Sequence, residues 1–118
     1  MPDTYKLFFD KLLVGEITDP FFSDGTWHGA CCLLIDSKQG QTAKRILDYI
    51  EFSRDWNRRI AASPSNPPEA SEFDRFHDVI NSGLWSVEIN NRERNRIINA
   101  PVFIEGKEMS WQVRQQSE

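Results

Sequence analysis

The 118-residue sequence contains few of the features that identify a chemical activity. It has no glycine-rich phosphate loop, no dinucleotide-binding fingerprint and no serine nucleophile elbow, so it lacks the signatures of the common nucleotide-binding enzymes and serine hydrolases. No apolar run approaches the roughly 20 residues that span a bilayer. The first residues also lack the basic region and apolar stretch of a signal peptide. We therefore expect a cytoplasmic protein that does not contact a membrane.

Cysteine is also scarce, and the only two are the neighbours Cys31 and Cys32. Adjacent residues on a strand point to opposite faces, so a disulfide between them would require unusual backbone geometry. Reduced thiols favour an intracellular compartment. Because both cysteines lie in the most apolar segment, we expect them to be buried and structural. Cys31 and Cys32, together with His28 and His77, do not match the spacing of zinc ligands, so the sequence predicts no metal site and no cofactor.

The composition is that of an ordinary globular domain, with 39% hydrophobic and 27% charged residues. A single domain over residues 1–118 is expected, because two halves would each be too small to bury a useful core. The 18 acidic and 14 basic side chains give a net charge of −4. This charge argues against a general nucleic-acid or anionic-membrane binder, so nucleic acid is not an expected partner.

The hydrophobic patterns predict strands and helices in the order βββ-αα-βββ. Strand–helix–strand alternation is absent, so a parallel doubly wound sheet is not expected. We predict an α+β fold, in which a mainly antiparallel sheet of about six strands carries two helices packed on one face. The predicted elements are strands at Tyr5–Phe9, Leu12–Thr18 and Trp27–Ile35, helices at Thr42–Ala62 and Glu69–Asn81, and strands at Leu84–Ile89, Arg96–Ile104 and Lys107–Val113.

Several of these predicted elements carry more specific signals. The near-continuous apolar run at Trp27–Ile35 is typical of a central strand buried on both faces. The helix at Thr42–Ala62 is amphipathic, with one broad apolar face that includes Ile60, and it places Asp55 and Arg59 four residues apart, as an ion pair requires. Pro101 removes one donor from the sheet, which favours an edge strand or a bulge there.

The segment Asp19–Gly29 is the most distinctive part of the chain. It mixes turn residues with large aromatics that an ordinary connection between strands does not need. Phe21 and Phe22 are adjacent, so an extended backbone lets only one of them point inward. We expect both to anchor the loop or the core, and the alternative is that one of them faces a partner. The candidate binding residues are Phe21, Phe22, Asp24, Trp27 and His28.

A catalytic alternative centres on His28, which Asp19 or Asp24 could orient as a general base. Both aspartates are also common turn formers, and local hydrogen bonds are the usual role of such a histidine, so no catalytic residue is assigned. His77 is interpreted as a core or interface histidine, because it falls on the apolar side of the second helix.

Two stretches, Val14–Asp19 and Ser23–Gly29, together with Ala100–Phe103 and Ser110-Trp111, resemble a type of small bacterial protein of unknown function. None of these stretches carries a catalytic signature. The resemblance implies a bacterial source and brings no activity with it.

We expect a non-enzymatic interaction protein, such as an immunity or accessory protein, that binds another protein through the aromatic loop or an exposed sheet edge. The alternative is a small hydrolase or ligand-binding enzyme that uses His28 with Asp19 or Asp24 in a pocket beside the sheet. A third alternative is homodimerisation through an edge strand near Pro101.

Overall fold

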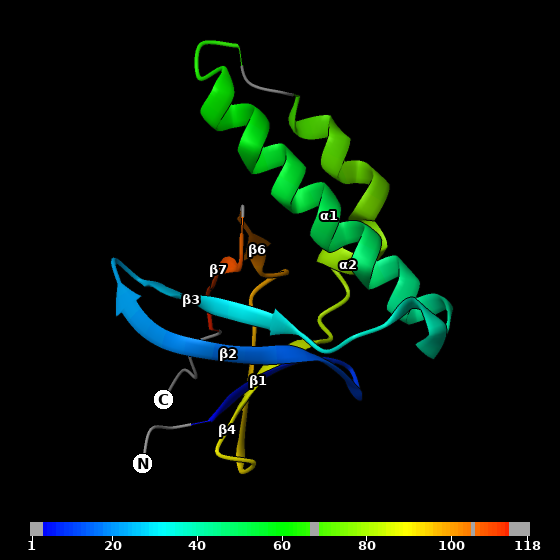
Figure 1. Ribbon diagram of the computed structural model, residues 1–118, viewed down its shortest axis with the longest axis vertical. Coiled ribbons are helices and arrows are strands. Elements are labelled where there is room, and N and C mark those ends of the chain that lie inside the picture. The colour runs from blue at the N-terminus through cyan, green and yellow to red at the C-terminus, as the bar shows by residue number, and fades with distance from the viewer. Residues whose placement is uncertain (1–3, 67–68, 105, 114–118) are drawn as a thin grey trace.

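A computed structural model describes residues 4–66, 69–104 and 106–113, and it has an antiparallel sheet covered by a long helix (Figure 1). The strand order in the described residues is β5-β4-β1-β2-β3-β7-β6. The elements are β1 (Tyr5–Phe9), β2 (Leu12–Ser23), β3 (Thr26–Leu33), η1 (Ser37–Gln39), α1 (Gln41–Ala62), η2 (Ala70–Phe76), α2 (His77–Ile80), β4 (Trp85–Ile89), β5 (Glu93–Arg96), β6 (Val102–Phe103) and β7 (Glu108–Trp111), where η marks a 3-10 helix.

The predicted α+β class and the antiparallel sheet are confirmed. The described chain has seven strands where about six were expected. The difference arises because β5 ends at Arg96, the first residue of the predicted strand Arg96–Ile104, and Val102–Phe103 then forms a separate strand, β6. Asn99 lies between the two with a φ of 59°. Asparagine is one of the few residues other than glycine that adopt this left-handed conformation readily, so it can end an extended run.

The hairpin of β2 and β3 is longer than the sequence predicts, because the segment 19–29 continues both strands. Ser23 pairs with Thr26, which leaves only Asp24 and Gly25 in the turn. Their φ angles are 51° and 78°, and Asp-Gly is a favoured sequence for a two-residue hairpin turn with two positive φ angles. The predicted loop is therefore the outer end of a hairpin.

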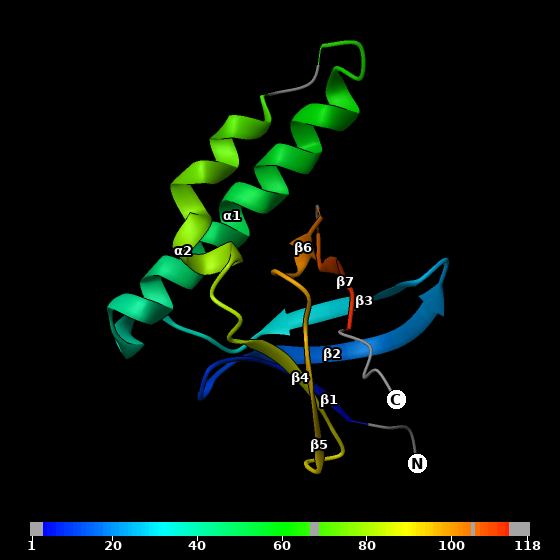
Figure 2. The same cartoon turned by 180° about the vertical axis from the view of Figure 1, so that it is seen from behind.

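A bulge bends this hairpin where Asp19 and Pro20 lie opposite Gly29. Thr18 pairs with Ala30 and the next pair is Phe21 with His28, so β2 contains one residue more than β3 between them. An added Cβ at Gly29 would lie 2.8 Å from Ile17 Cγ2, so a larger residue does not fit without a shift. Beyond the bulge, β2 runs past β1, whose pairing ends at Tyr5 with Ile17 in the described residues, whereas β3 stays paired with β7 as far as Trp27 (Figure 2).

The core lies between the sheet and α1. Beyond β5, Ile97 forms an antiparallel bridge with Val113, and the Ile98 N–H donates to the Gln112 carbonyl over 2.7 Å. These bonds join the chain that leaves β5 to the chain that leaves β7, although the two strands lie far apart in the sheet order. The sheet therefore curls around the core. The largest fully buried side chains of the core, from the sheet and the helices together, include Leu7, Ile46, Phe76, Trp85, Phe103 and Met109.

The helix α1 buries most of its predicted apolar face and extends beyond the sheet, with η2 beside it (Figures 1 and 2). The predicted ion pair is present, with Arg59 Nε 3.1 Å from Asp55 Oδ2. Ile60 is exposed, because the last turns of α1 lie outside the core. The second predicted helix begins as the 3-10 helix η2 and becomes α-helical only at α2. In the described part of the chain, no helix is both long and apolar enough to cross a membrane.

Polar side chains of α1 bond the outer edge of β6. Ser53 Oγ donates to the Phe103 carbonyl over 3.0 Å and accepts from the Phe103 N–H over 2.9 Å. Asn57 donates to the same carbonyl, and the Tyr49 hydroxyl donates to the Pro101 carbonyl over 2.9 Å. As Pro101 predicts, the strand that follows it is an edge strand, and the helix takes the place of a further strand there.

Replacing Ser53 by alanine should lower the free energy of unfolding by about 1–3 kcal/mol, because the buried Phe103 N–H loses its acceptor. Urea denaturation of the full chain measures this change. The exposed Ser71 provides the control, and its alanine variant should change stability by less than about 0.5 kcal/mol. Equal denaturation midpoints for Ser53→Ala and the wild-type chain would show that these bonds do not hold β6.

The pH dependence of stability should report on Tyr49. Burial raises the pKa of Tyr49 from 10.0 to about 12, against the opposing effect of its hydrogen bond with Ser53. The unfolded chain ionises this hydroxyl above pH 10, whereas the folded chain keeps it neutral until about pH 12. The wild-type chain should therefore lose about 1.4 kcal/mol per pH unit across this window relative to Tyr49→Phe. Denaturation of both proteins at pH 8 to 12 checks this, and a constant difference would contradict it.

Candidate functional site

The outer end of the β2–β3 hairpin carries aromatic pairs on both of its faces. Phe22 pairs with Trp27, and Phe21 pairs with His28. Directly paired residues share a face and neighbours alternate, so the two pairs lie on opposite faces of the hairpin. The Phe21 ring stacks on the His28 ring with centroids 5.0 Å apart, and Phe22 meets Trp27 edge-on at 5.4 Å.

Both phenylalanines are exposed to solvent. Phe21 is 57% exposed and Phe22 is 58% exposed, more than any other large hydrophobic side chain named as exposed in the described residues. A core position for both rings is therefore wrong, whereas their role in anchoring the loop stays a prediction. The reason is that the strands continue outward past the core, where the hairpin has no further layer to cover it. Exposed aromatic rings of this kind are typical anchors of protein interfaces.

The face that carries Phe22 is joined to the core through stacked rings. Trp27 stacks on Trp111 at 6.0 Å with an angle of 11° between the planes, and Tyr5 lies 6.1 Å from Trp27. Trp111 is buried, Trp27 is half-buried and Phe22 is exposed. This row of rings leads from the core to the outer end of the hairpin and holds that end against the body of the protein.

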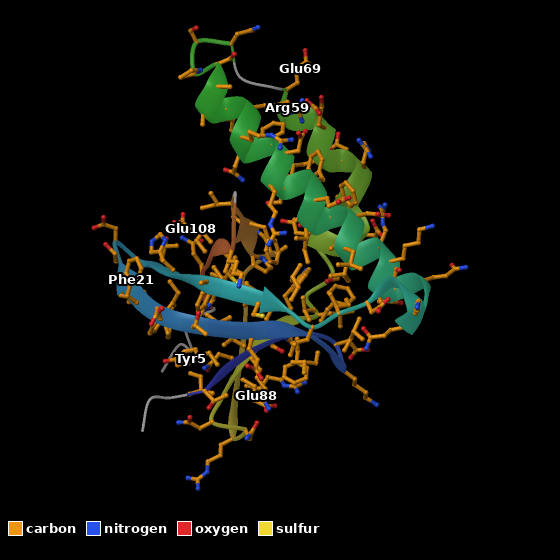
Figure 3. The ribbon with its side chains drawn as sticks, in the orientation of Figure 1. Tyr5, Phe21, Arg59, Glu69, Glu88 and Glu108 are labelled. Carbon is orange, nitrogen blue, oxygen red and sulfur yellow. The ribbon has the colours of Figure 1, made fainter. Side chains whose placement is uncertain are left out.

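The opposite face carries a cleft of about 270 Å³ beside Phe21 and His28. Ala30 pairs with Glu108 of β7, and the Ile104 N–H donates to the Glu108 carbonyl, so pairing brings these residues next to the hairpin. The small side chain of Ala30 leaves a depression between its larger neighbours. Figure 3 shows Phe21 toward the free end of the hairpin and Glu108 on the neighbouring strand. The side chains that line the cleft include those of Asp19, Phe21, His28, Ala30, Ile104 and Glu108.

The charge around this cleft is negative. The sequence contains no lysine or arginine from Leu12 to Ser37, a stretch that includes Asp19 and Asp24. In the part of the chain that the structure describes, the side chains of Asp19 and Glu108 form no ion pair or hydrogen bond, although both line the cleft. The cleft therefore presents two carboxylates without a counter-ion beside an exposed aromatic ring.

The structure contains only part of the geometry that the catalytic alternative requires. His28 and Asp19 line the same cleft, whereas Asp24 lies in the turn at the end of the hairpin. Ser110 is the cross-strand partner of His28. Among the described residues, no hydrogen bond joins His28 to Asp19, Asp24 or Ser110. General-base catalysis requires such contacts within hydrogen-bond reach, and they often tighten only when substrate binds.

The two cysteines lie on opposite faces of β3, but only one is buried. Cys31 is buried, and an added Cβ at Gly15 would lie 2.9 Å from its Sγ. Burial raises the pKa of Cys31 to about 11, so this thiol is not activated. Cys32 is exposed, so the expectations that both cysteines are buried and that β3 is covered on both faces are wrong. The sequence misses this because a near-continuous apolar run does not reveal that one face lacks a covering layer.

His77 is exposed, so its interpretation as a core residue is wrong, and its role at an interface stays a prediction. It is the first residue of the short helix α2, in which Val79 takes the buried position. In the described ranges, no group of three or more histidine, cysteine, aspartate or glutamate side chains is arranged to hold a metal ion.

No family model matches the chain, and searches of curated proteins and of solved structures found no similar protein. The resemblance to small bacterial proteins of unknown function therefore stays an expectation. The geometry of the hairpin and its cleft is the basis for the function proposed below.

Thiol labelling should distinguish the two cysteines. With an aromatic disulfide reagent at pH 8, the folded chain should expose one reactive thiol, that of Cys32, and the denatured chain should expose both. Cys32→Ser should remove the reaction of the folded chain, and Cys31→Ser should keep it. Rapid labelling of Cys31 in the folded Cys32→Ser protein would contradict its burial.

Proposed function

We propose that this chain is a non-enzymatic interaction module that binds another protein through the outer end of the β2–β3 hairpin. The observation that carries the proposal is the exposure of Phe21 and Phe22 on opposite faces of a hairpin whose strand β2 extends beyond β1. An immunity or accessory role is the form of this function that the net charge of −4, the aromatic residues of the hairpin and the lack of catalytic sequence signatures favour.

The sheet edges at β6 and at the hairpin do not suit the addition of a partner strand, which favours binding through the side chains of the hairpin. At β6, the N–H and carbonyl of Phe103 are already bonded to α1. On the hairpin, β1 pairs with β2 only as far as Ile17 in the described residues. Beyond that point the edge contains the Asp19-Pro20 bulge, and proline offers no N–H to an incoming strand. A partner is therefore expected to contact the aromatic side chains.

The charge of the hairpin supports a basic partner. Acidic residues flank both exposed rings, and the whole stretch from Leu12 to Ser37 lacks a lysine or arginine. Opposite charges across an interface accelerate association and select against wrong partners, whereas buried rings supply most of the binding energy. Phe21 and Phe22 would act as anchors, and Asp19 and Asp24 would steer the partner.

The alternative functions have less support. A small hydrolase or ligand-binding enzyme would use His28 with Asp19, but no hydrogen bond joins these side chains in the described chain. Homodimerisation near Pro101 would use an edge at which Phe103 is already bonded to α1. Either alternative would leave the paired exposure of Phe21 and Phe22 without a role.

Phe21→Ser and Phe22→Ser should each weaken partner capture about tenfold or more while the chain stays folded, because each removes an exposed anchor. The full-length variants serve as bait in extracts of cells that express the protein, with capture measured by quantitative mass spectrometry and folding by circular dichroism. Leu34→Ser is the matched control, because Leu34 is also 48% exposed and follows the other end of β3.

Two outcomes would overturn the proposal. The first is that both serine variants unfold, which would make the rings part of the core. The second is that both variants stay folded and capture the same proteins as the Leu34→Ser control. Light scattering of the purified chain shows whether the captured protein is a second copy, because a self-associating chain would be larger than its 13.7 kDa monomer.

A further inference from the structure

We infer that the cleft beside Phe21 receives an arginine side chain of the partner. The inference rests on the proposed function, because it assigns the chemistry of the partner at the same hairpin. It requires a cavity of suitable shape, an aromatic surface for the guanidinium plane and acidic groups to pair with it. The cleft offers all three.

The shape of the cleft suits a long side chain with an apolar stem. The short side chain of Ala30 and the apolar side chain of Ile104 line part of the cleft, and the stacked rings of Phe21 and His28 line another part. The methylene groups of an arginine can pack against Ala30 and Ile104 while the guanidinium lies against the Phe21 ring. A guanidinium is planar and weakly hydrated, so it stacks on an aromatic face more favourably than an ammonium does.

The charges point to a cation in this place. Asp19 comes from the bulge of β2 and Glu108 from β7, so two carboxylates approach the cleft from different strands. Among the lining residues the titratable groups are these two and His28, and none is a lysine or arginine. Lys107 adjoins Glu108 in sequence, but it does not line the cleft and forms no ion pair in the described chain.

The described chain builds the same arrangement with its own arginines at three other places. In each place an arginine lies over an aromatic ring and pairs with a carboxylate. Arg45 Cζ lies 4.5 Å from the centroid of the Phe76 ring, and Arg45 Nη2 lies 2.7 Å from Asp78 Oδ1. Arg59 Cζ lies 5.8 Å from the Trp56 centroid, and its Nη2 lies 2.8 Å from Glu72 Oε1. Arg94 Cζ lies 4.2 Å from the Phe8 centroid, and its Nη2 lies 3.1 Å from Glu88 Oε2. The cleft contains the ring and the carboxylates, and the partner would supply the arginine.

Titration of the full chain with the blocked peptide acetyl-Gly-Arg-Gly-amide, followed by ¹H–¹⁵N NMR, tests the inference. The backbone signals of His28, Ala30 and Glu108 should shift saturably, with affinity in the millimolar range expected of a single side chain, on the order of 1 mM. The matching citrulline peptide has nearly the same shape without the charge and should bind at least about fivefold more weakly. The lysine peptide should also bind more weakly than the arginine peptide.

Two variants alter the cleft in different ways. Asp19→Asn/Glu108→Gln removes both charges, keeps a residue that tolerates the positive φ at position 19, and should weaken arginine-peptide binding about fivefold or more. Ala30→Leu leaves the charge unchanged but fills the cleft, so it should abolish the shifts. Glu51→Gln/Asp74→Asn is the matched control, because it removes two exposed carboxylates from the helices and should bind as the wild-type chain does.

The inference is overturned if the citrulline or lysine peptide binds as well as the arginine peptide, or if the cleft variants bind as the helix control does. Partner capture separates it from the proposed function. If Asp19→Asn/Glu108→Gln captures the partner normally while Phe21→Ser and Phe22→Ser do not, the arginine assignment fails and the proposed function stands. If the arginine peptide binds as expected but both serine variants keep the partner, the proposed function fails and the cleft remains an arginine site.

Discussion

The reciprocal hydrogen bonds between Ser53 and Phe103 connect the two layers of this fold. The strand β6 spans only two residues, so it has little pairing of its own, and one side chain of α1 satisfies both its N–H and its carbonyl at Phe103. Because buried backbone groups are costly to leave unbonded, this contact places α1 across the end of the sheet. Tyr49, one turn away on the helix, then packs between Trp85 and Phe103 and completes the core.

The helix α1 bonds the outer edge of β6, and the bridge from Ile97 to Val113 joins the segment after β5 to the segment after β7. The outer end of the β2–β3 hairpin remains as a part of the sheet without a covering layer. The stacked rings of Trp27 and Trp111 hold it, so its exposed side chains are presented on a supported scaffold. Such preorganisation reduces the entropy lost when a partner binds.

The sequence contains the local information for most of the fold but not for the cleft. Periodicity predicts α1 and the β1–β2 hairpin, because each depends on residues that are close in sequence. The turn residues of segment 19–29 predict a loop, and only the pairing of β2 with β3 shows that Asp24 and Gly25 form a hairpin turn and that Asp19 and Pro20 form a bulge opposite Gly29. Phe21 and His28 could be named from the sequence. Ala30, Ile104 and Glu108 could not, because the pairing of β3 with β7 brings them together.

Exposed rings at the outer end of the hairpin create a risk of self-association, and the residues that reduce this risk also carry the charge that the proposed basic partner would meet. Pro20 and the bulge at Asp19 make the outer edge a poor template for another strand. Asp19 and Asp24 place negative charge beside Phe21 and Phe22, so two copies of the hairpin repel each other. The same negative charges that repel a second copy of the hairpin attract a basic surface. The acidic groups can therefore keep the rings exposed in the free protein and favour a cationic partner in the complex.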